Sequence, residues 1–216
     1  MSPIRTRYQT IEFGDIDIHL RTLRDHQQYA DPDGKAELLG ISSALWPLFG
    51  VIWPSSLVMS NFLLDYNYAG KRILEVGCGI GLSSLLLNHF KADITATDYH
   101  PEVEGFLAQN VLLNDGRKIP FILSNWNDIN LELGLFDLII GSDLLYEDEH
   151  AFLLSAFIQR HANIKCSVIV VDPGRGRHGK FSTHMTAAGF SYNKSKPLDT
   201  HFLKDAFAGN ILEYQR

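Results

Sequence analysis

Residues 73–81 read ILEVGCGIG, and this stretch decides the fold. Its apolar first half is typical of a buried strand, and Gly77, Gly79 and Gly81 follow where a helix then begins. Glycines at such a turn let the backbone approach a ligand closely, and the free N–H groups of the helix start favour anionic or polar ligand groups. The stretch therefore predicts a strand, a tight turn and a helix that together bind a ligand.

From residue 71 onward, short apolar runs alternate with helical stretches. Runs such as LIIG (138–141) and VIVV (168–171) are apolar on both faces, as strands between two helical layers must be. This alternation predicts an α/β fold with a doubly wound, mostly parallel sheet. The tail adds two strand candidates, 190–198 and 210–215, with no helix between them. We expect seven strands, of which the last two form an antiparallel hairpin.

Residues 1–70 come before this alternation and are expected to form an N-terminal extension of the ligand-binding domain at 71–216. Two alternating runs within 8–23 surround Gly14 and predict a β-hairpin. Residues 51–66 predict a helix opened by a proline, a residue favoured at the first helical position. We expect this extension to help form the substrate side of the site.

Composition excludes several classes of protein. The chain has 216 residues, 45% of them hydrophobic and 20% charged, which is ordinary globular usage. A net charge of −6 argues against a general nucleic-acid binder. Two distant cysteines argue against a disulfide scaffold and favour a reducing compartment. With no apolar leader and no membrane-spanning run, we expect a monomeric cytoplasmic protein that binds neither nucleic acid nor membrane.

A carboxylate ends the next predicted strand. Asp98 follows Gly77 by 21 residues (98 − 77), the place from which an acidic side chain accepts both hydroxyls of a ribose. A dinucleotide fingerprint would need a third glycine at Leu82, so a different nucleoside ligand is favoured. Two alternatives stay open: the glycines serve only tight packing, and Asp98 only caps a helix starting at Pro101.

The pattern E-x-G-x-G-x-G from Glu75 to Gly81 resembles the first motif of the seven-strand S-adenosylmethionine-dependent methyltransferases. The resemblance covers roughly residue 72 to the C-terminus and implies S-adenosylmethionine as the cofactor. It implies that the cofactor is bound by Glu75, Gly77, Gly79, Gly81, Asp98 and Tyr99.

The end of the third predicted strand adds candidates for the adenine. Asn125 carries a polar group suited to the adenine amine, and the indole of Trp126 is suited to stacking on the ring. Asp128 is an alternative partner, and Trp126 is alternatively a core aromatic. Ligands in open α/β sheets bind beyond the carboxyl ends of the strands, so Ser142, which ends the fourth strand, is also expected at the cofactor.

Asp143-Leu144-Leu145-Tyr146 resembles the Asp-x-x-Tyr motif of the seven-strand protein-lysine methyltransferases. Trp53, followed by proline, is similar to a segment of that group whose aromatic lies near the cofactor. Residues 172–175, DPGR, are similar to the same place in the electron-transfer-flavoprotein β-subunit lysine methyltransferases, the nearest subgroup. The N-terminal residues do not resemble a mitochondrial presequence, so we expect the chain to depart from that subgroup in this respect, which leaves room for a different target.

Methyl transfer from a sulfonium to an amine chiefly requires alignment, because it is an in-line displacement. A lysine amine has a pKa of about 10.4 in water and must lose a proton before it attacks. A carboxylate such as Asp143 is suited to orienting the amine, and Tyr146 to lining the lysine channel. In the alternative, Asp143 caps the next helix and Tyr146 packs beneath it.

The remaining histidines, Cys78 and two arginines give weaker indications of a function. His150, His161, His178 and His184 lack metal-ligand spacing and are interpreted as surface or capping residues, so no metal is expected. Cys78 has no nearby base and is not expected to be a nucleophile. Arg175 and Arg177 either hold a carboxylate or an acidic surface, or lie in a solvated loop.

The sequence thus predicts an S-adenosylmethionine-dependent N-methyltransferase acting on a lysine of a protein substrate, with the electron-transfer-flavoprotein β subunit as a candidate target. Small-molecule N- or O-methylation on the same fold is one alternative. A nucleotide-binding protein without turnover is another. A nicotinamide-dependent dehydrogenase is disfavoured by Leu82 and by the lack of a placed proton donor.

Overall fold

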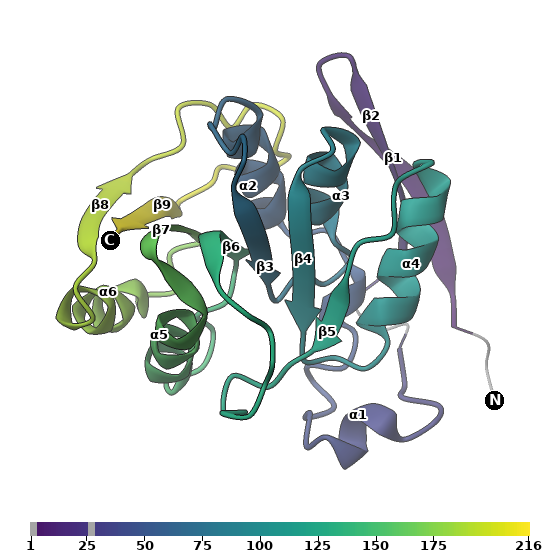
Figure 1. The fold of residues 1–216 in the computed structure, drawn as a ribbon. Coiled ribbons are helices and arrows are strands. Elements are labelled where there is room, and N and C mark those ends of the chain that lie inside the picture. The colour runs from purple at the N-terminus through teal and green to yellow at the C-terminus, as the bar shows by residue number, and fades with distance from the viewer. Residues whose placement is uncertain (1–3, 26–28) are drawn as a thin grey trace.

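A seven-stranded sheet forms the centre of the computed structural model, which describes residues 4–25 and 29–216 (Figure 1). The strand order is β5-β4-β3-β6-β7-β9-β8. The β7–β9 and β9–β8 pairs are antiparallel, and the pairs among β3 to β7 are parallel. The strands are β3 (Arg72–Val76), β4 (Asp93–Asp98), β5 (Phe121–Leu123), β6 (Phe136–Ser142), β7 (Ala162–Asp172), β8 (Ser191–Ser195) and β9 (Asn210–Gln215).

The predicted α/β class, the mostly parallel seven-stranded sheet and its closing hairpin are confirmed. Some boundaries differ from the prediction. The strand that contains the apolar run 168–171, β7, already begins at Ala162. The added residues were not recognised because Ile164 and Lys165 are exposed, so the buried apolar pattern starts later than the strand.

Helices cover both faces of the sheet. They are α2 (Pro54–Leu64), α3 (Leu82–His89) and α4 (Val103–Leu113) on one face and α5 (His150–His161) and α6 (His178–Ala187) on the other. The short helix α1 (Lys35–Leu38) and a 3₁₀ turn at Leu48–Gly50 lie in the segment before α2. The helix predicted at 51–66 is α2, which begins one residue after Trp53 with a proline at its first turn. Within the described residues, no helix is long and apolar enough to cross a membrane.

Alternate residues of each central strand enter two separate apolar clusters. Ile73 of β3 packs with the side chains of α2, α3 and α4, whereas Leu74 packs with those of α5 and α6. Ile139 and Ile140 of β6 divide in the same way. Because both faces are buried, the strands read as continuous apolar runs in the sequence.

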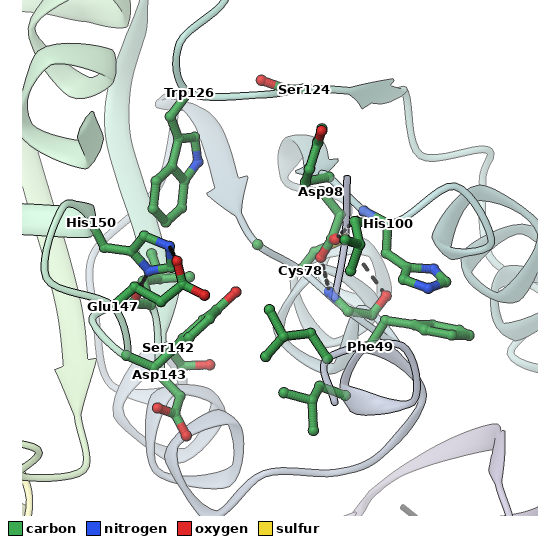
Figure 2. Close-up of a pocket in the computed structure, with 18 of the residues that line it drawn as sticks. Phe49, Cys78, Asp98, His100, Ser124, Trp126, Ser142, Asp143, Glu147 and His150 are labelled. Carbon is green, nitrogen blue, oxygen red and sulfur yellow. Dashed lines mark hydrogen bonds and ion pairs between the residues drawn. The ribbon is translucent and has the colours of Figure 1, made fainter. Parts of the chain in front are cut away.

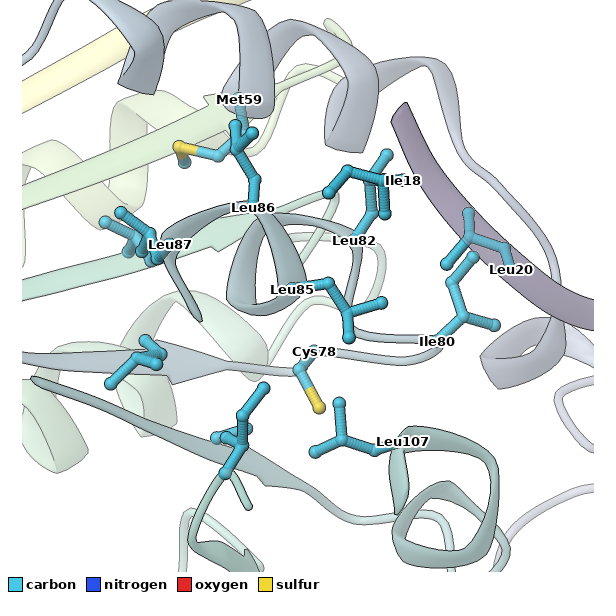
Figure 3. Close-up of a cluster of buried hydrophobic side chains, with 14 of the residues drawn as sticks. Ile18, Leu20, Met59, Cys78, Ile80, Leu82, Leu85, Leu86, Leu87 and Leu107 are labelled. Carbon is cyan, nitrogen blue, oxygen red and sulfur yellow. The ribbon is translucent and has the colours of Figure 1, made fainter. Parts of the chain in front are cut away.

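The predicted N-terminal hairpin is present as β1 (Thr6–Phe13) and β2 (Ile16–Leu23). Ile18 and Leu20 of β2 are fully buried in the cluster around α3 (Figure 3). Asn110 of α4 and Asn114, the C-cap of that helix, also hold β2: the Arg21 amide donates to Asn110 at 2.7 Å and the His19 amide to Asn114 at 2.8 Å. The hairpin is thus packed against the helices that support the glycine loop.

We expect Asn110→Ala to lower the free energy of unfolding by about 1–3 kcal/mol, because it leaves buried backbone groups unpaired. The fully buried Asn110 side chain also donates to the Ile80 carbonyl at 3.1 Å, inside the glycine loop. Urea denaturation measures the change. Asn114→Ala is the matched control and should have a smaller effect, since water can reach the groups that it frees. Equal losses in the two variants would contradict this account of the hairpin.

Candidate active site

A cavity of about 640 Å³ lies at the carboxyl ends of β3, β4, β5 and β6, closed on the other side by segments within residues 39–56. Ten of the predicted site residues line it: Trp53, Gly77, Gly79, Asp98, Tyr99, Asn125, Trp126, Ser142, Asp143 and Tyr146. In Figure 2, Asp98, His100 and Phe49 lie on one side of it and Trp126, His150 and Glu147 on the other. Two predicted residues, Glu75 and Gly81, do not line the cavity.

The glycine loop joins β3 to α3. Gly77, Gly79 and Gly81 all have positive φ, a conformation that residues with a side chain rarely adopt. A Cβ added at Gly79 would lie 2.9 Å from the Phe49 carbonyl oxygen, so a side chain there would also clash with the segment that closes the cavity. Gly81 begins α3 behind the cavity wall, which explains why it does not line the cavity.

Glu75 is buried behind the loop. Its carboxylate accepts a hydrogen bond from the Ser84 amide at 2.9 Å and another from the Ser84 hydroxyl. A carboxylate in this position satisfies a free N–H at the start of α3 and is favoured by the helix dipole. Desolvation nevertheless raises the pKa of Glu75 to about 7. Glu75 therefore holds the helix that follows the loop.

Asp98 connects β4 to the same loop. One carboxylate oxygen accepts from the Gly79 amide at 2.9 Å and the other from the His100 amide at 2.8 Å. Helix α4 has Glu102 as its N-cap, so the alternative role of Asp98 as a cap of that helix is wrong. Desolvation raises the pKa of Asp98. The carboxylate is held at the cavity wall by two backbone donors.

Several cavity residues were missed by sequence reasoning, among them Phe49, His100 and Ser124. The His100 ring stacks on Phe49 with centroids 4.0 Å apart, and burial lowers the pKa of His100 to about 4, so the ring is neutral. Within the described part of the chain, His100 Nε2 and Ser124 Oγ are buried without a hydrogen-bond partner. Buried polar atoms are normally paired, so unpaired ones at a cavity wall are suited to a ligand. In the sequence, the indication that His100 and Ser124 belong to the site is that they lie close in the chain to Asp98 and Asn125.

Asp143 follows β6 in a left-handed conformation, with φ of 55°, and its amide donates to the Val171 carbonyl. Its carboxylate receives two hydrogen bonds from Arg175, from Nε at 2.8 Å and from the second terminal nitrogen at 2.9 Å. Arg175 belongs to the turn after β7, where the Gly174 amide donates to Asp172. Of the two alternatives for Arg175, the structure supports the one in which it holds a carboxylate.

The cap interpretation of Asp143 is also wrong, because helix α5 has Glu149 as its N-cap. Tyr146 is 39% exposed and lines the cavity, so it does not pack beneath that helix. Arg177 pairs with the exposed Asp148 at 3.1 Å, away from the cavity lining. Burial raises the pKa of the Cys78 thiol well above its usual range, in agreement with its predicted lack of nucleophilic chemistry.

The cavity wall is acidic. Four carboxylates line it, those of Asp98, Asp143, Glu147 and Glu149, against one guanidinium, that of Arg175. A cleft lined by one sign of charge attracts ligands of the other sign. Among the described residues, no group of three or more metal-ligating side chains is found.

His150 differs from its interpretation as a surface or capping residue. Its side chain is 12% exposed and lines the cavity next to Trp126 and Tyr146. The sequence carries no sign of this, because His150 lies four residues after Tyr146 and outside any motif.

A doubly wound sheet with this strand order and a glycine-loop cavity defines the fold of the S-adenosylmethionine-dependent methyltransferases. A solved structure of that class, magnesium protoporphyrin IX methyltransferase from Synechocystis, has a TM-score of 0.58 at 21% identity, covering 76% of this chain and 77% of that one. The family described as lysine methyltransferase matches residues 47–188. The chain belongs to that family.

Two curated relatives agree with the family. The electron transfer flavoprotein beta subunit lysine methyltransferase of Xenopus laevis is 31% identical over 148 residues, which is 65% of this chain and 58% of the relative. The protein N-lysine methyltransferase METTL21A of Danio rerio is 34% identical over 137 residues, 59% of this chain and 58% of the relative. This chain therefore matches less than two thirds of the length of each relative.

We expect Glu75→Gln to remove a pH dependence of stability. Because burial raises the folded-state pKa from 4.5 to about 7, folded Glu75 retains its proton over an interval in which the unfolded chain loses it. Wild-type stability should therefore fall as pH rises from about 4.5 to 7, by about 3 kcal/mol relative to Glu75→Gln at roughly 1.4 kcal/mol per pH unit.

Urea denaturation from pH 4 to 8 measures this difference. Glu104→Gln, at an exposed carboxyl on α4, is the control and should keep the wild-type pH dependence. Parallel stability curves for wild type and Glu75→Gln would show that the buried carboxyl does not titrate in this interval.

Proposed function

We propose that this protein uses S-adenosylmethionine to methylate a lysine side chain of a protein substrate. The observation that carries the proposal is one continuous cavity with Asp98 beside the glycine loop and Asp143 with Tyr146 in the same wall. Membership of the lysine methyltransferase family supports it. So do the relatives, whose names describe protein lysine methyltransferases.

S-adenosylmethionine supplies, when bound, a methyl group on a positively charged sulfonium. We propose that Gly77 and Gly79 allow the backbone to approach the cofactor, with Gly81 and Glu75 holding the loop from behind. Asp98 accepts hydrogen bonds from the ribose hydroxyls. Further contacts are assigned to the rest of the wall: Asn125, Trp126 and Tyr99 at the adenine, Ser142 at the fourth strand end, and Trp53 at the methionine end.

The charge of the cavity supports this cofactor over a dinucleotide. NAD carries a negatively charged pyrophosphate, which four lining carboxylates would repel. The sulfonium of S-adenosylmethionine and the ammonium of a lysine are both cationic. The same wall therefore suits both partners of the reaction.

Asp143 is the residue that we propose to orient the amine. Its two-point contact with Arg175 fixes the plane of the carboxylate, and the side chain itself is only 9% exposed. Tyr146 lines the same wall and is exposed, as expected for the entrance of a lysine channel. Alignment of nucleophile and methyl group accounts for much of the rate in such displacements.

We call the part of the cavity around Asp143 and Tyr146 the acceptor end. A protein substrate is favoured over a small molecule because this end lies at the molecular surface. Glu147 and Glu149 line the cavity and are themselves partly or fully exposed, so an acidic channel opens toward solvent. The electron-transfer-flavoprotein β subunit is our candidate target, on the name of the Xenopus relative. We further propose a cytoplasmic monomer, with residues 1–70 contributing the substrate side; the two free, buried cysteines suit a reducing compartment.

We expect Asp98→Ala to weaken S-adenosylmethionine binding by roughly 10- to 100-fold, since hydrogen bonds to a charged group contribute about 1.5–3 kcal/mol. Isothermal titration calorimetry measures the affinity for S-adenosylmethionine and for NAD. Glu104→Ala, at an exposed carboxylate on α4 outside the cavity lining, is the control and should bind like wild type. Wild-type preference for NAD, or no binding of the methyl donor, would overturn the cofactor assignment.

We expect Asp143→Asn to reduce methyl transfer by about 100-fold without changing the affinity for S-adenosylmethionine, because misplacement of the nucleophile affects only the transfer step. Arg175→Lys should fall between this variant and wild type, since it keeps the charge and loses the two-point contact. Tritium transfer to cell-lysate proteins, followed by amino-acid analysis, gives the rate and the modified residue.

Asp148→Asn serves as the control for these variants, because Asp148 is exposed and pairs with Arg177 outside the cavity lining. Label on small molecules alone, or on a residue other than lysine, would contradict the proposed acceptor.

A further inference from the structure

His150, the first residue of α5, lines the cavity beside Tyr146 of the proposed acceptor site and Trp126 of the proposed adenine site. The edge of its ring packs against two aromatic neighbours, Tyr146 at 4.5 Å and Trp126 at 5.1 Å between centroids, both nearly perpendicular. Figure 2 shows the ring beside Trp126 and Glu147. The two aromatic contacts restrict the orientation of the imidazole.

The hydrogen bonds of the ring define its tautomer. Nδ1 lies 2.8 Å from the Leu144 carbonyl oxygen, which can only accept, so Nδ1 carries the hydrogen. Neutral His150 must then have its lone pair on Nε2. Nε2 lies 3.5 Å from Oε2 of Glu147, whose side chain is 45% exposed.

The other polar groups at the acceptor end are poorly suited to receive a proton. Both oxygens of Asp143 already accept hydrogen bonds from Arg175. Burial raises the pKa of Tyr146 to about 12, so the phenol stays protonated at neutral pH. His100 is neutral, but it lies next to Phe49 on the Asp98 side of the cavity. In the tautomer that the Leu144 contact defines, Nε2 of His150 has the lone pair that can receive a proton.

We propose that His150 accepts the proton that the substrate lysine must lose before methylation, and that Glu147 passes this proton to solvent; the inference rests on the proposed function. The Nζ–H bond of the ammonium breaks and an N–H bond forms at Nε2, which leaves a lone pair on Nζ. That pair then bonds to the methyl carbon, and the electrons of the broken C–S bond stay on sulfur. The product is a methylated ammonium, and the extra proton is on His150.

The charges that surround His150 favour this transfer. Glu147 lies in its own preceding loop, and Glu149 and Asp143 line the same cavity. The nearby cations are both engaged: Arg175 binds Asp143, and Arg160 donates to the Trp126 carbonyl. A carboxylate-rich surrounding stabilises the imidazolium once it forms. Histidine is also the side chain most suited to proton exchange near neutral pH.

Long-range ¹H–¹⁵N spectra of the full-length protein with ¹⁵N-labelled histidine test the tautomer without any acceptor. The His150 signals are assigned by comparison with His150→Asn. We expect a neutral ring at pH 8.5 with hydrogen on Nδ1 and none on Nε2. A neutral ring with hydrogen on Nε2 would overturn the proposal, whatever the protein methylates.

The second test is the pH profile of tritium transfer to lysate proteins. His150→Asn keeps an amide N–H near the Leu144 carbonyl and removes the base; His150→Gln is used if the first variant does not fold. We expect transfer about 100-fold slower at pH 7, with the loss shrinking above pH 9 as lysine loses its proton unaided. Glu147→Gln should show a smaller loss, and neither variant should change the affinity for S-adenosylmethionine.

A loss that is equal at every pH would mean that His150 has only a structural role. His184→Asn, at a histidine of α6 outside the cavity lining, is the control and should follow the wild-type profile. If wild type neither binds S-adenosylmethionine nor labels any lysate protein, the proposed function fails, and the tautomer measured by NMR still decides whether His150 has the lone pair that the relay needs.

Discussion

The two hydrogen bonds that the Asp98 carboxylate accepts, from the Gly79 and His100 amides, are the interaction on which the site depends. They connect the end of β4 to the turn after β3, so the glycine loop and the carboxylate keep one geometry. Gly77 and Gly79 are required in the loop by positive φ and close approach, so these two positions contribute no side chain that could fix its shape. Glu75 holds the same loop from behind through Ser84. Buried carboxylates on both sides therefore define a loop that would otherwise be the most flexible part of the site.

The acceptor end is built differently, from side chains that pair with one another. Asp143 is held by Arg175, and His150 is held by the Leu144 carbonyl and the rings of Trp126 and Tyr146. The Asp143–Arg175 pair and the His150–Trp126 contact join segments that follow different strands, so their geometry depends on the sheet. The scaffold is rigid because both faces of β3, β6 and β7 pack into apolar clusters. A rigid scaffold with paired polar groups at its edge can align a nucleophile without large rearrangement.

Most of the fold was predictable because its signals are local. Buried parallel strands read as apolar runs, and a glycine turn between a strand and a helix is typical of a ligand-binding loop. The start of β7 was missed where Ile164 and Lys165 point to solvent, since an exposed strand end has no apolar pattern. The candidate site was predictable where a residue ends a strand or directly follows one, as Asp98 and Asp143 do. Phe49 and His150 follow no strand, and their place in the cavity depends on contacts between distant segments.

By itself, the sequence determined the order of strands and helices, the glycine loop and the carboxylates at the strand ends, because these depend on chain spacing and on the two-residue period of a strand. Only the tertiary structure decided which side chains pair. Arg175 reaches Asp143 across 32 positions of the chain, and Glu75 faces Ser84 and not the cavity. Hydrogen-bond geometry is set by distances of about 3 Å between atoms, and such distances between segments are set by packing. For the same reason, no sequence motif indicates the tautomer of His150, which depends on the contact of its ring with the Leu144 carbonyl in the folded chain.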